Sequence, residues 1–133
     1  MLHLEACEVD DATAQITVAV HSTQATAPCP LCTTPAQRIH SHYERTLADL
    51  PWADYHVRLQ LRARKWFCCN RSCHRRISTE RLPTIAAPWA RRMLRLAQRF
   101  VALGMALGGK AGVRLGHQWD LVVSRNTLLR GLR

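Results

Sequence analysis

The chain has little of what a secreted or membrane-bound protein needs. Its 133 residues contain only six cysteines, too few for a disulfide-rich secreted scaffold, and its first 11 residues carry four carboxylates where a signal peptide has an apolar core. The longest run of apolar and glycine residues, 100–109, is far shorter than the about 20 residues that cross a bilayer. These absences predict a soluble, cytoplasmic protein without a membrane partner.

Acidic residues are scarce in the second part of the chain. Residues 1–55 hold seven carboxylates and two arginines, a balance of −5, whereas residues 56–133 hold 17 Lys or Arg against Glu80 and Asp120, a balance of +15. This asymmetry predicts a polyanionic partner such as nucleic acid. Two simpler interpretations stay open: an ordinary solvated basic face, or arginines that neutralise a nearby metal–thiolate cluster.

Four cysteines have the spacing of two metal-binding knuckles, Cys29-x-x-Cys32 and Cys68-x4-Cys73. A knuckle is a tight turn that directs two thiolates at one point, and two knuckles supply the four soft ligands of a tetrahedral structural zinc site. Asn70 is a turn-forming residue inside the second knuckle. The spacing therefore predicts Zn²⁺ bound by these four cysteines, with disulfides as the alternative.

The remaining cysteines and two histidines are weaker candidates for ligands. Cys69 also has a permissible spacing, Cys69-x3-Cys73, so spacing alone does not choose between Cys68 and Cys69. We expect Cys7 to be a small buried side chain. His40 and His42 could be metal ligands, but with four cysteines available we expect them to be surface or hydrogen-bonding groups.

Two segments of the first part alternate as half-buried strands do. In residues 14–20 the apolar side chains fall on one face, and in residues 56–64 they alternate with polar ones. The outer face of the second segment presents Arg58, Arg62 and Arg64, which predicts either a phosphate-contacting surface or an ordinary solvent face. Residues 1–83 are thus predicted to form a small antiparallel β domain of the zinc-ribbon type.

After Pro83 the apolar pattern acquires the period of a helix. It predicts helices over residues 89–107 and 110–119, separated by Gly108-Gly109, and a third helix that starts at the N-cap Ser124 and runs towards Leu132. Residues 84–133 are therefore predicted to form a three-helix helix-turn-helix domain. The fold class expected for the whole chain is α+β, with the small β zinc-ribbon-like domain first.

A helix-turn-helix places the N-terminal side chains of its last helix on DNA bases. Arginine pairs with guanine and asparagine with adenine, while lysine and serine suit phosphates. A plain three-helix packing unit without a ligand is the alternative. The predicted contacts in this part are Lys110, Arg114, Ser124, Arg125, Asn126, Thr127 and Arg130.

The order of motifs resembles the N-terminal zinc finger of bacterial insertion-sequence transposases of the ISL-three family. The resemblance rests on residues 29–32 (CPLC), 40–45 (HSHYER), 49–51 (DLP), 64–68 (RKWFC), Asn70, Cys73 and 76–83 (RISTERLP). Residues 106–112 and 124–130 resemble the helix-turn-helix of the same family. The resemblance favours Cys68 over Cys69, and it departs from the family at Thr33, where a glycine is common.

The resemblance implies recognition of transposon ends, with cutting and joining left to a separate DDE-type catalytic domain. Such a domain needs three carboxylates around two metal ions, and beyond residue 55 the chain has only Glu80 and Asp120. We therefore expect no catalysis by this chain, since a site closed by four thiolates also leaves no position for water.

The sequence as a whole predicts a bacterial, nucleoid-associated DNA-binding module that recognises terminal inverted repeats during DNA transposition and recombination. Its expected partners are double-stranded DNA and, in addition, a second copy or a full-length transposase. The alternatives are a zinc-ribbon module for protein interaction or oligomerisation, and a non-specific nucleic-acid binder that inhibits transposition.

Overall fold

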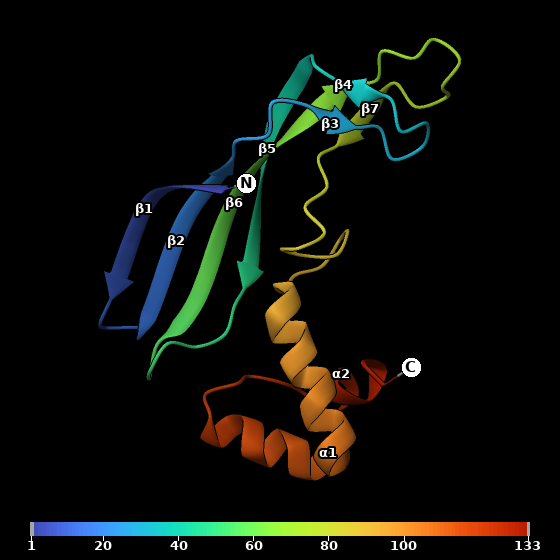
Figure 1. The fold of residues 1–133 in the computed structure, drawn as a ribbon. Helices are drawn as coiled ribbons and strands as arrows, with labels where there is room; N and C mark the ends of the chain where they lie inside the picture. The colour runs from blue at the N-terminus through green and yellow to red at the C-terminus, as the bar shows by residue number, and fades with distance from the viewer. Residues whose placement is uncertain (1, 133) are drawn as a thin grey trace.

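The computed structural model describes residues 2–132 as a sheet-rich α+β fold with two helices (Figure 1). The small β zinc-ribbon-like part of the predicted fold is present. The strands are β1 (Leu2–Asp10), β2 (Gln15–Ser22), β3 (Ala27–Pro28), β4 (Pro35–Ala36), β5 (Ile39–Ala48), β6 (His56–Phe67) and β7 (Ile77–Thr79), and the helices are α1 (Leu94–Gln118) and α2 (Arg125–Arg130).

The main sheet has the strand order β1-β2-β6-β5, with β7 paired to β6, and it is mixed rather than antiparallel. The pairs β1–β2, β5–β6 and β6–β7 are antiparallel, but β2 and β6 run parallel. The predicted all-antiparallel unit is therefore wrong. Between β2 and β6 the chain passes through the β3–β4 ribbon and returns along β5, which is the long crossover that a parallel pair requires.

The two strands predicted from alternation are confirmed. On β2, Ile16 and Val20 are buried, and on β6 the residues Leu59, Leu61 and Ala63 are buried while Arg58, Gln60 and Arg62 are exposed. The segment that follows β7 covers this apolar face, with Leu82, Ile85, Ala86, Ala90 and Met93 packed against the sheet. One face of β6 is thus core, and the other carries its basic side chains.

The first helix begins at Leu94, five residues later than predicted. Residues 91–93 are extended beside the end of β5: the N–H of Ala48 donates to the carbonyl oxygen of Arg91 (2.9 Å), and the N–H of Met93 donates to the carbonyl oxygen of Ala48 (2.9 Å). These hydrogen bonds hold the backbone straight where the side-chain pattern alone allows a helix. Tertiary pairing therefore decides the start of α1.

The predicted three-helix helix-turn-helix over residues 84–133 is not seen, and that part of the prediction is wrong. Within residues 84–132 the structure has the helices α1 and α2, and the backbone of α1 (Leu94–Gln118) leaves the helical region at Gly108 (φ 71°, ψ −172°), which produces a kink. The second helix, α2, has six residues. The break predicted at Gly108-Gly109 is thus present as a kink at Gly108, and helical backbone resumes directly after it.

The helices form a small core of their own, made by Leu96, Phe100, Leu103, Leu121, Val123 and Leu128. Gly112 permits the close approach of α2, because a Cβ at this position would lie 2.7 Å from Cδ1 of Leu128. Ser124 is the N-cap of α2, as predicted, and its hydroxyl oxygen accepts from the N–H of Thr127 at 3.2 Å. Among residues 2–132, no helix combines the length and the apolarity needed to span a bilayer.

A buried carboxylate, Glu80, joins three parts of the sheet. Its Oε1 accepts from the hydroxyl of Ser22 on β2 (2.5 Å), and its Oε2 accepts from the backbone N–H of Arg64 on β6 (3.2 Å). The guanidinium of Arg64 forms an ion pair with Glu80 at 3.4 Å, and the Arg64 side chain is only 14% exposed. Glu80 therefore balances a charge that is largely removed from water.

We expect Glu80→Ala to lower the free energy of unfolding by about 3 kcal/mol, because the variant leaves the half-buried Arg64 without its carboxylate. Urea denaturation of the zinc-loaded protein measures this change. The matched control is Glu44→Ala, an exposed carboxylate on β5, for which the change should stay within about 0.5 kcal/mol. Equal, small effects of the two substitutions would contradict the structural role of Glu80.

Candidate metal centre and nucleic-acid interface

The first knuckle lies in the loop between β3 and β4. The N–H of Cys29 donates to the carbonyl oxygen of Thr34 (3.0 Å), and the N–H of Thr33 donates to the carbonyl oxygen of Cys29 (2.8 Å), so the loop closes tightly. Thr33 has φ 62°, a conformation that favours glycine over a β-branched residue. The position at which the sequence departs from the family is therefore a strained one.

The second knuckle lies in the loop between β6 and β7. The N–H of Cys68 donates to the carbonyl oxygen of Arg76 (2.8 Å), and the N–H of Cys73 donates to the carbonyl oxygen of Asn70 (3.1 Å). The side-chain oxygen of Asn70 also accepts from the N–H of Ser72 at 3.0 Å. This confirms Asn70 as the turn-forming residue of the knuckle.

The two loops bring four sulfur atoms together. The Sγ atoms of Cys29, Cys32, Cys68 and Cys73 all lie within 4.8 Å of one another. Two of the cross-loop distances are 3.9 Å (Cys29–Cys73) and 3.6 Å (Cys32–Cys68). A tetrahedral ion with Zn–S bonds of about 2.3 Å separates its sulfurs by about 3.8 Å. The donor set and its spacing therefore fit a structural Zn²⁺ ion.

The other two cysteines lie outside this cluster. Cys69 is exposed, and its thiol lies 3.4 Å from the carbonyl oxygen of Pro35. The cluster thus contains Cys68 rather than Cys69, the choice that the resemblance favoured. Cys7 is exposed on β1, so the expectation of a buried side chain was wrong; β1 is an edge strand, and packed side chains do not cover it there.

Hydrogen bonds divide the four thiols into two pairs with different acidity. Bonds from Thr34 lower the pKa of Cys32 to about 6, and backbone N–H groups of Cys32 and Leu31 lower the pKa of Cys29. A backbone hydrogen bond from Asn70 favours the Cys68 thiolate, but desolvation and the neighbouring thiols outweigh it and raise its pKa to about 12. The first knuckle is therefore the more ready to ionise.

The pKa of Cys73 is also raised, because desolvation and the thiol of Cys32 outweigh a backbone hydrogen bond from Arg75. Four thiolates this close repel one another, and a bound dication removes that repulsion. Zn²⁺ supplies charge compensation and a cross-link between the two loops. A centre closed by four sulfurs has no ligand position for water, so it is suited to structure and not to hydrolysis.

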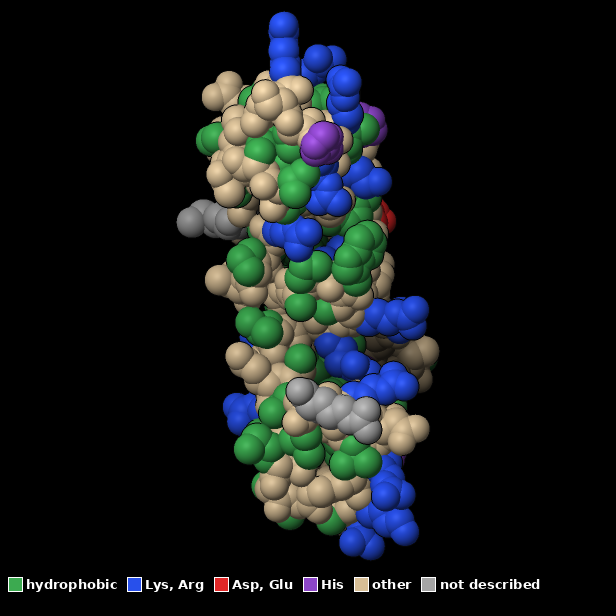
Figure 2. Space-filling view, turned by 90° about the vertical axis from the view of Figure 1, so that its right-hand side faces the viewer, with side chains coloured by type: hydrophobic (Ala, Val, Ile, Leu, Met, Phe, Trp, Pro, Cys, Tyr) green, Lys and Arg blue, Asp and Glu red, His purple; other side chains and the backbone are tan. Residues whose placement is uncertain are grey.

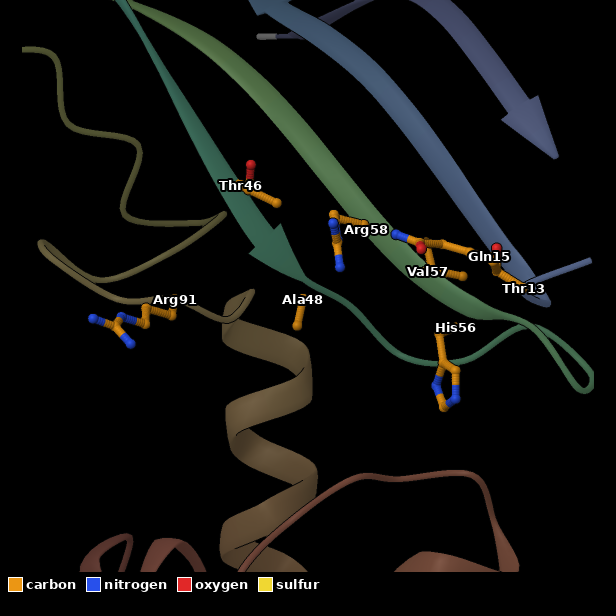
Figure 3. Close-up of a pocket in the computed structure, with 8 residues that line it drawn as sticks. All are labelled: Thr13, Gln15, Thr46, Ala48, His56, Val57, Arg58 and Arg91. Carbon is orange, nitrogen blue, oxygen red and sulfur yellow. The ribbon is translucent and has the colours of Figure 1, made fainter. Parts of the chain in front are cut away.

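The three arginines predicted on β6 have different environments. Arg58 and Arg62 are exposed on the face of β6 that lies opposite the core. Arg58 lines an open pocket together with His56, while Arg91 lines it from the segment before α1 (Figure 3). Arg64 is turned inward, where it pairs with Glu80 and lies 4.8 Å from the ring of Trp66. Its guanidinium is thus already engaged within the fold.

The predicted contacts in the helical part all lie on α1, on α2 or at the N-cap. Lys110 and Arg114 are exposed one turn apart on α1, and the side chain of Arg125 passes over Gly109, where a Cβ would meet it at 2.7 Å. Asn126 and Arg130 are exposed on α2. The hydroxyls of Ser124 and Thr127 lie 2.9 Å apart and hold the first turn of α2. The structure therefore places the side chain of Arg125 against α1 at Gly109, the residue before Lys110.

None of the predicted DNA contacts lies in the zinc loop or in the segment before α1. Arg71, Arg75 and Arg76 of the zinc loop are exposed, and Arg91 is exposed just before α1. The zinc-loop arginines were considered only as charge compensation for the thiolates. Their position in a short loop with no carboxylate is the sequence signal for this exposed basic surface.

The fold and the four-cysteine centre define a zinc ribbon, in which one metal ion links two loops that connect β-strands. Residues 25–73 match the family model of the zinc-finger of transposase IS204/IS1001/IS1096/IS1165. This match, together with the four clustered cysteines, agrees with the resemblance of the segment to the zinc finger of ISL-three-type transposases. Neither a curated protein nor a solved structure matches the chain.

We expect the purified protein to contain about one zinc ion per chain, as four-thiolate sites do. Cys32→Ser and Cys68→Ser should each lose most of this zinc, because each removes a sulfur from the cluster, and should unfold at lower urea concentrations than the wild type. Elemental analysis after dialysis measures the metal content. Cys69→Ser is the matched control and should retain the zinc. Loss of zinc in Cys69→Ser with retention in Cys68→Ser would reverse the assignment.

Proposed function

We propose that this chain is a DNA-binding module of a transposase and that it binds the terminal inverted repeats of its transposon as double-stranded DNA. The proposal rests on the zinc-ribbon match of residues 25–73 together with one feature of the surface, its concentration of positive charge. In this proposal the protein acts on the nucleoid in the bacterial cytoplasm. Residues 1–83 and 84–133 are its two functional units.

The charge distribution is the observation that carries the proposal. In residues 56–132 the two carboxylates are Glu80, which is buried and paired, and Asp120, so Asp120 is the one exposed carboxylate of this range. Figure 2 shows Lys and Arg side chains from the zinc end to the helical end of one face, with almost no Asp or Glu. Such a surface neutralises DNA phosphates along its length.

Each predicted contact has a role in this proposal. Lys110, Arg114, Arg125 and Arg130 neutralise phosphates from the helical end, and Arg58 and Arg62 do so from β6. Asn126, an exposed amide on α2, is the side chain that we assign to a base edge, because asparagine forms paired hydrogen bonds with adenine. Ser124 and Thr127 lie at the same surface and fix the first turn of α2. Arg64 contributes indirectly, since it supports β6 from within.

We further propose that this chain binds DNA without cutting it. Two-metal strand transfer needs clustered carboxylates. Within residues 2–132, the four cysteines are the one group of three or more Cys, His, Asp or Glu side chains placed to hold a metal ion. A bound, non-cutting module of this kind would occupy transposon ends and act together with a catalytic chain or domain, or inhibit it.

We expect the zinc-loaded protein to bind a duplex of the inverted-repeat end at least about tenfold more tightly than a scrambled duplex, a free-energy difference of about 1.4 kcal/mol. Affinity should fall by about 10³-fold or more between about 50 and 200 mM salt if six or more phosphates are contacted. Fluorescence anisotropy at both salt concentrations measures the two quantities. Salt-insensitive binding, or no binding to any duplex, would refute the proposal.

Lys110→Ala and Asn126→Ala should have different effects on the preference for the end duplex over the scrambled duplex. Lys110→Ala should weaken binding to the end duplex and to the scrambled duplex alike, because a phosphate contact carries no sequence information. Asn126→Ala should weaken binding to the end duplex by about 1–3 kcal/mol and leave the scrambled duplex nearly unchanged. The same anisotropy titrations measure both variants.

Gln98→Ala, an exposed polar residue on the first part of α1, serves as the control and should bind both duplexes as the wild type does. An equal loss on both duplexes in Asn126→Ala would assign this residue to the backbone and remove the base contact from the proposal.

A further inference from the structure

The segment before α1 contains a tight turn over residues 87–90, and Trp89 occupies its third position. The N–H of Ala90 donates to the carbonyl oxygen of Ala87 at 3.1 Å, Pro88 is second in the turn, and Trp89 has φ 63°. Proline at the second position and a positive φ at the third are the features of a type II turn, whose third residue is normally glycine or asparagine. Tryptophan is therefore a strained choice here.

The indole of Trp89 contributes little to packing. It is 93% exposed, the most exposed large apolar side chain described in residues 2–132. The neighbouring residues behave differently, since Ala86 is buried and Ile85 and Ala90 pack against the sheet. Neither the turn nor the core accounts for a tryptophan at this position, and strained residues of this kind concentrate at functional sites.

The turn is held in place from β5. The guanidinium of Arg45 donates to the carbonyl oxygen of Ala90 at 2.6 Å and to that of Ala87 at 3.4 Å, so it bonds to the first and the last residue of the turn. Directly afterwards the backbone of residues 91–93 pairs with Ala48. The exposed indole therefore stands on a turn that is fixed to the sheet, which limits the entropy lost when it binds a partner.

The surroundings of the turn are basic. Residues 81–93 contain Arg81, Arg91 and Arg92 and no carboxylate, and both Arg81 and Arg91 are exposed. The segment lies between the zinc-bearing sheet and the helices (Figure 1), and Lys and Arg side chains extend towards both ends of the face in Figure 2. An exposed aromatic ring among cations is the combination that stacks on nucleic-acid bases.

We propose that Trp89 is a base-stacking side chain, which binds DNA by stacking on a base that has left its neighbour or by entering between two base pairs as a wedge. This inference rests on the proposed function. It adds a contact that depends on unstacking of the DNA bases and not on the charge of the phosphates. The arginines of residues 81–93 bind the phosphates of the DNA backbone. The indole gains an apolar contact with a base, and the free-energy cost is the unstacking of one base-pair step. The strained backbone of Trp89 at φ 63° lowers the stability of the fold, and it presents the indole for that contact.

The test compares Trp89→Gly with the wild type and with Trp52→Ala, which removes another exposed tryptophan from the β5–β6 hairpin. Trp89→Gly should raise the urea midpoint, because glycine suits a positive φ. It should also weaken binding to the inverted-repeat duplex by about fivefold or more, the value of one stacked base. With 2-aminopurine placed at successive positions of that duplex, the wild type should change the fluorescence at one position, and Trp89→Gly should not. Trp52→Ala should match the wild type in affinity and in the 2-aminopurine signal.

Each other outcome overturns the inference. A lower urea midpoint for Trp89→Gly would show that the indole packs within the fold. Equal duplex affinity of Trp89→Gly and wild type would show that Trp89 does not contact DNA, while leaving the proposed function intact. If the wild type then showed a molecular mass that rises with concentration and Trp89→Gly did not, the indole would be assigned to contact with a second copy of the chain. Absence of duplex binding by the wild type would refute the proposed function and this inference together.

Discussion

The meeting of two cysteine loops at one end of the sheet is the constraint on which the rest of the fold depends. Cys29 and Cys73 are 44 positions apart in sequence, yet their sulfurs lie 3.9 Å apart. The local core is small, with only Ala27, Ala36 and Trp66 buried together, and β3 and β4 have two residues each. So small an apolar core is not enough to hold the two cysteine loops in one relative position, whereas one metal ion bound by four thiolates is. The first of these loops also belongs to the long crossover between β2 and β6, which allows the two strands to run parallel.

Two carboxylates are buried in ion pairs within the fold. Glu80 is buried against Arg64, and the buried carboxylate of Asp49 binds the guanidinium of Arg95 with Oδ1 2.6 Å from its Nε. The pair Asp49–Arg95 also connects the end of β5 with α1. The other seven carboxylates are exposed, but six of them lie in residues 1–55, so Asp120 is the one acidic side chain exposed among the arginines of residues 56–132. The net positive charge therefore becomes a surface property as well as a property of the composition.

Five non-glycine residues of the described part have a positive φ, and two of them, the β-branched Thr33 and the aromatic Trp89, are residue types that rarely adopt it; both lie at the surface. Thr33 closes the first knuckle at φ 62°, and Trp89 stands at the tip of a type II turn at φ 63°. At Thr33 the metal cluster fixes the loop, so the strain is tolerated by the cross-link beside it. At Trp89 the Arg45 guanidinium fixes the turn, and the strain presents an indole to solvent. The sequence pattern signals neither conformation, because positive φ is visible from sequence mainly where glycine or asparagine stands.

The sequence by itself determined the metal centre, the two main strands and the cap of the last helix. Cysteine spacing, the alternation of residues along β2 and β6, and Ser124 before α2 all act over a few residues, and such short-range patterns are readable without a structure. Only the tertiary structure decided the parallel pairing of β2 with β6, the start of α1 at Leu94 and the close packing of α2 on α1. Each of these depends on contacts between distant segments: the crossover through the zinc ribbon, the hydrogen bonds between Ala48 and residues 91–93, and the packing of α2 on Gly112. Local propensity does not contain that information, because a backbone hydrogen bond or a close glycine contact made across the fold outweighs the few tenths of a kcal/mol by which side chains prefer one local conformation to another.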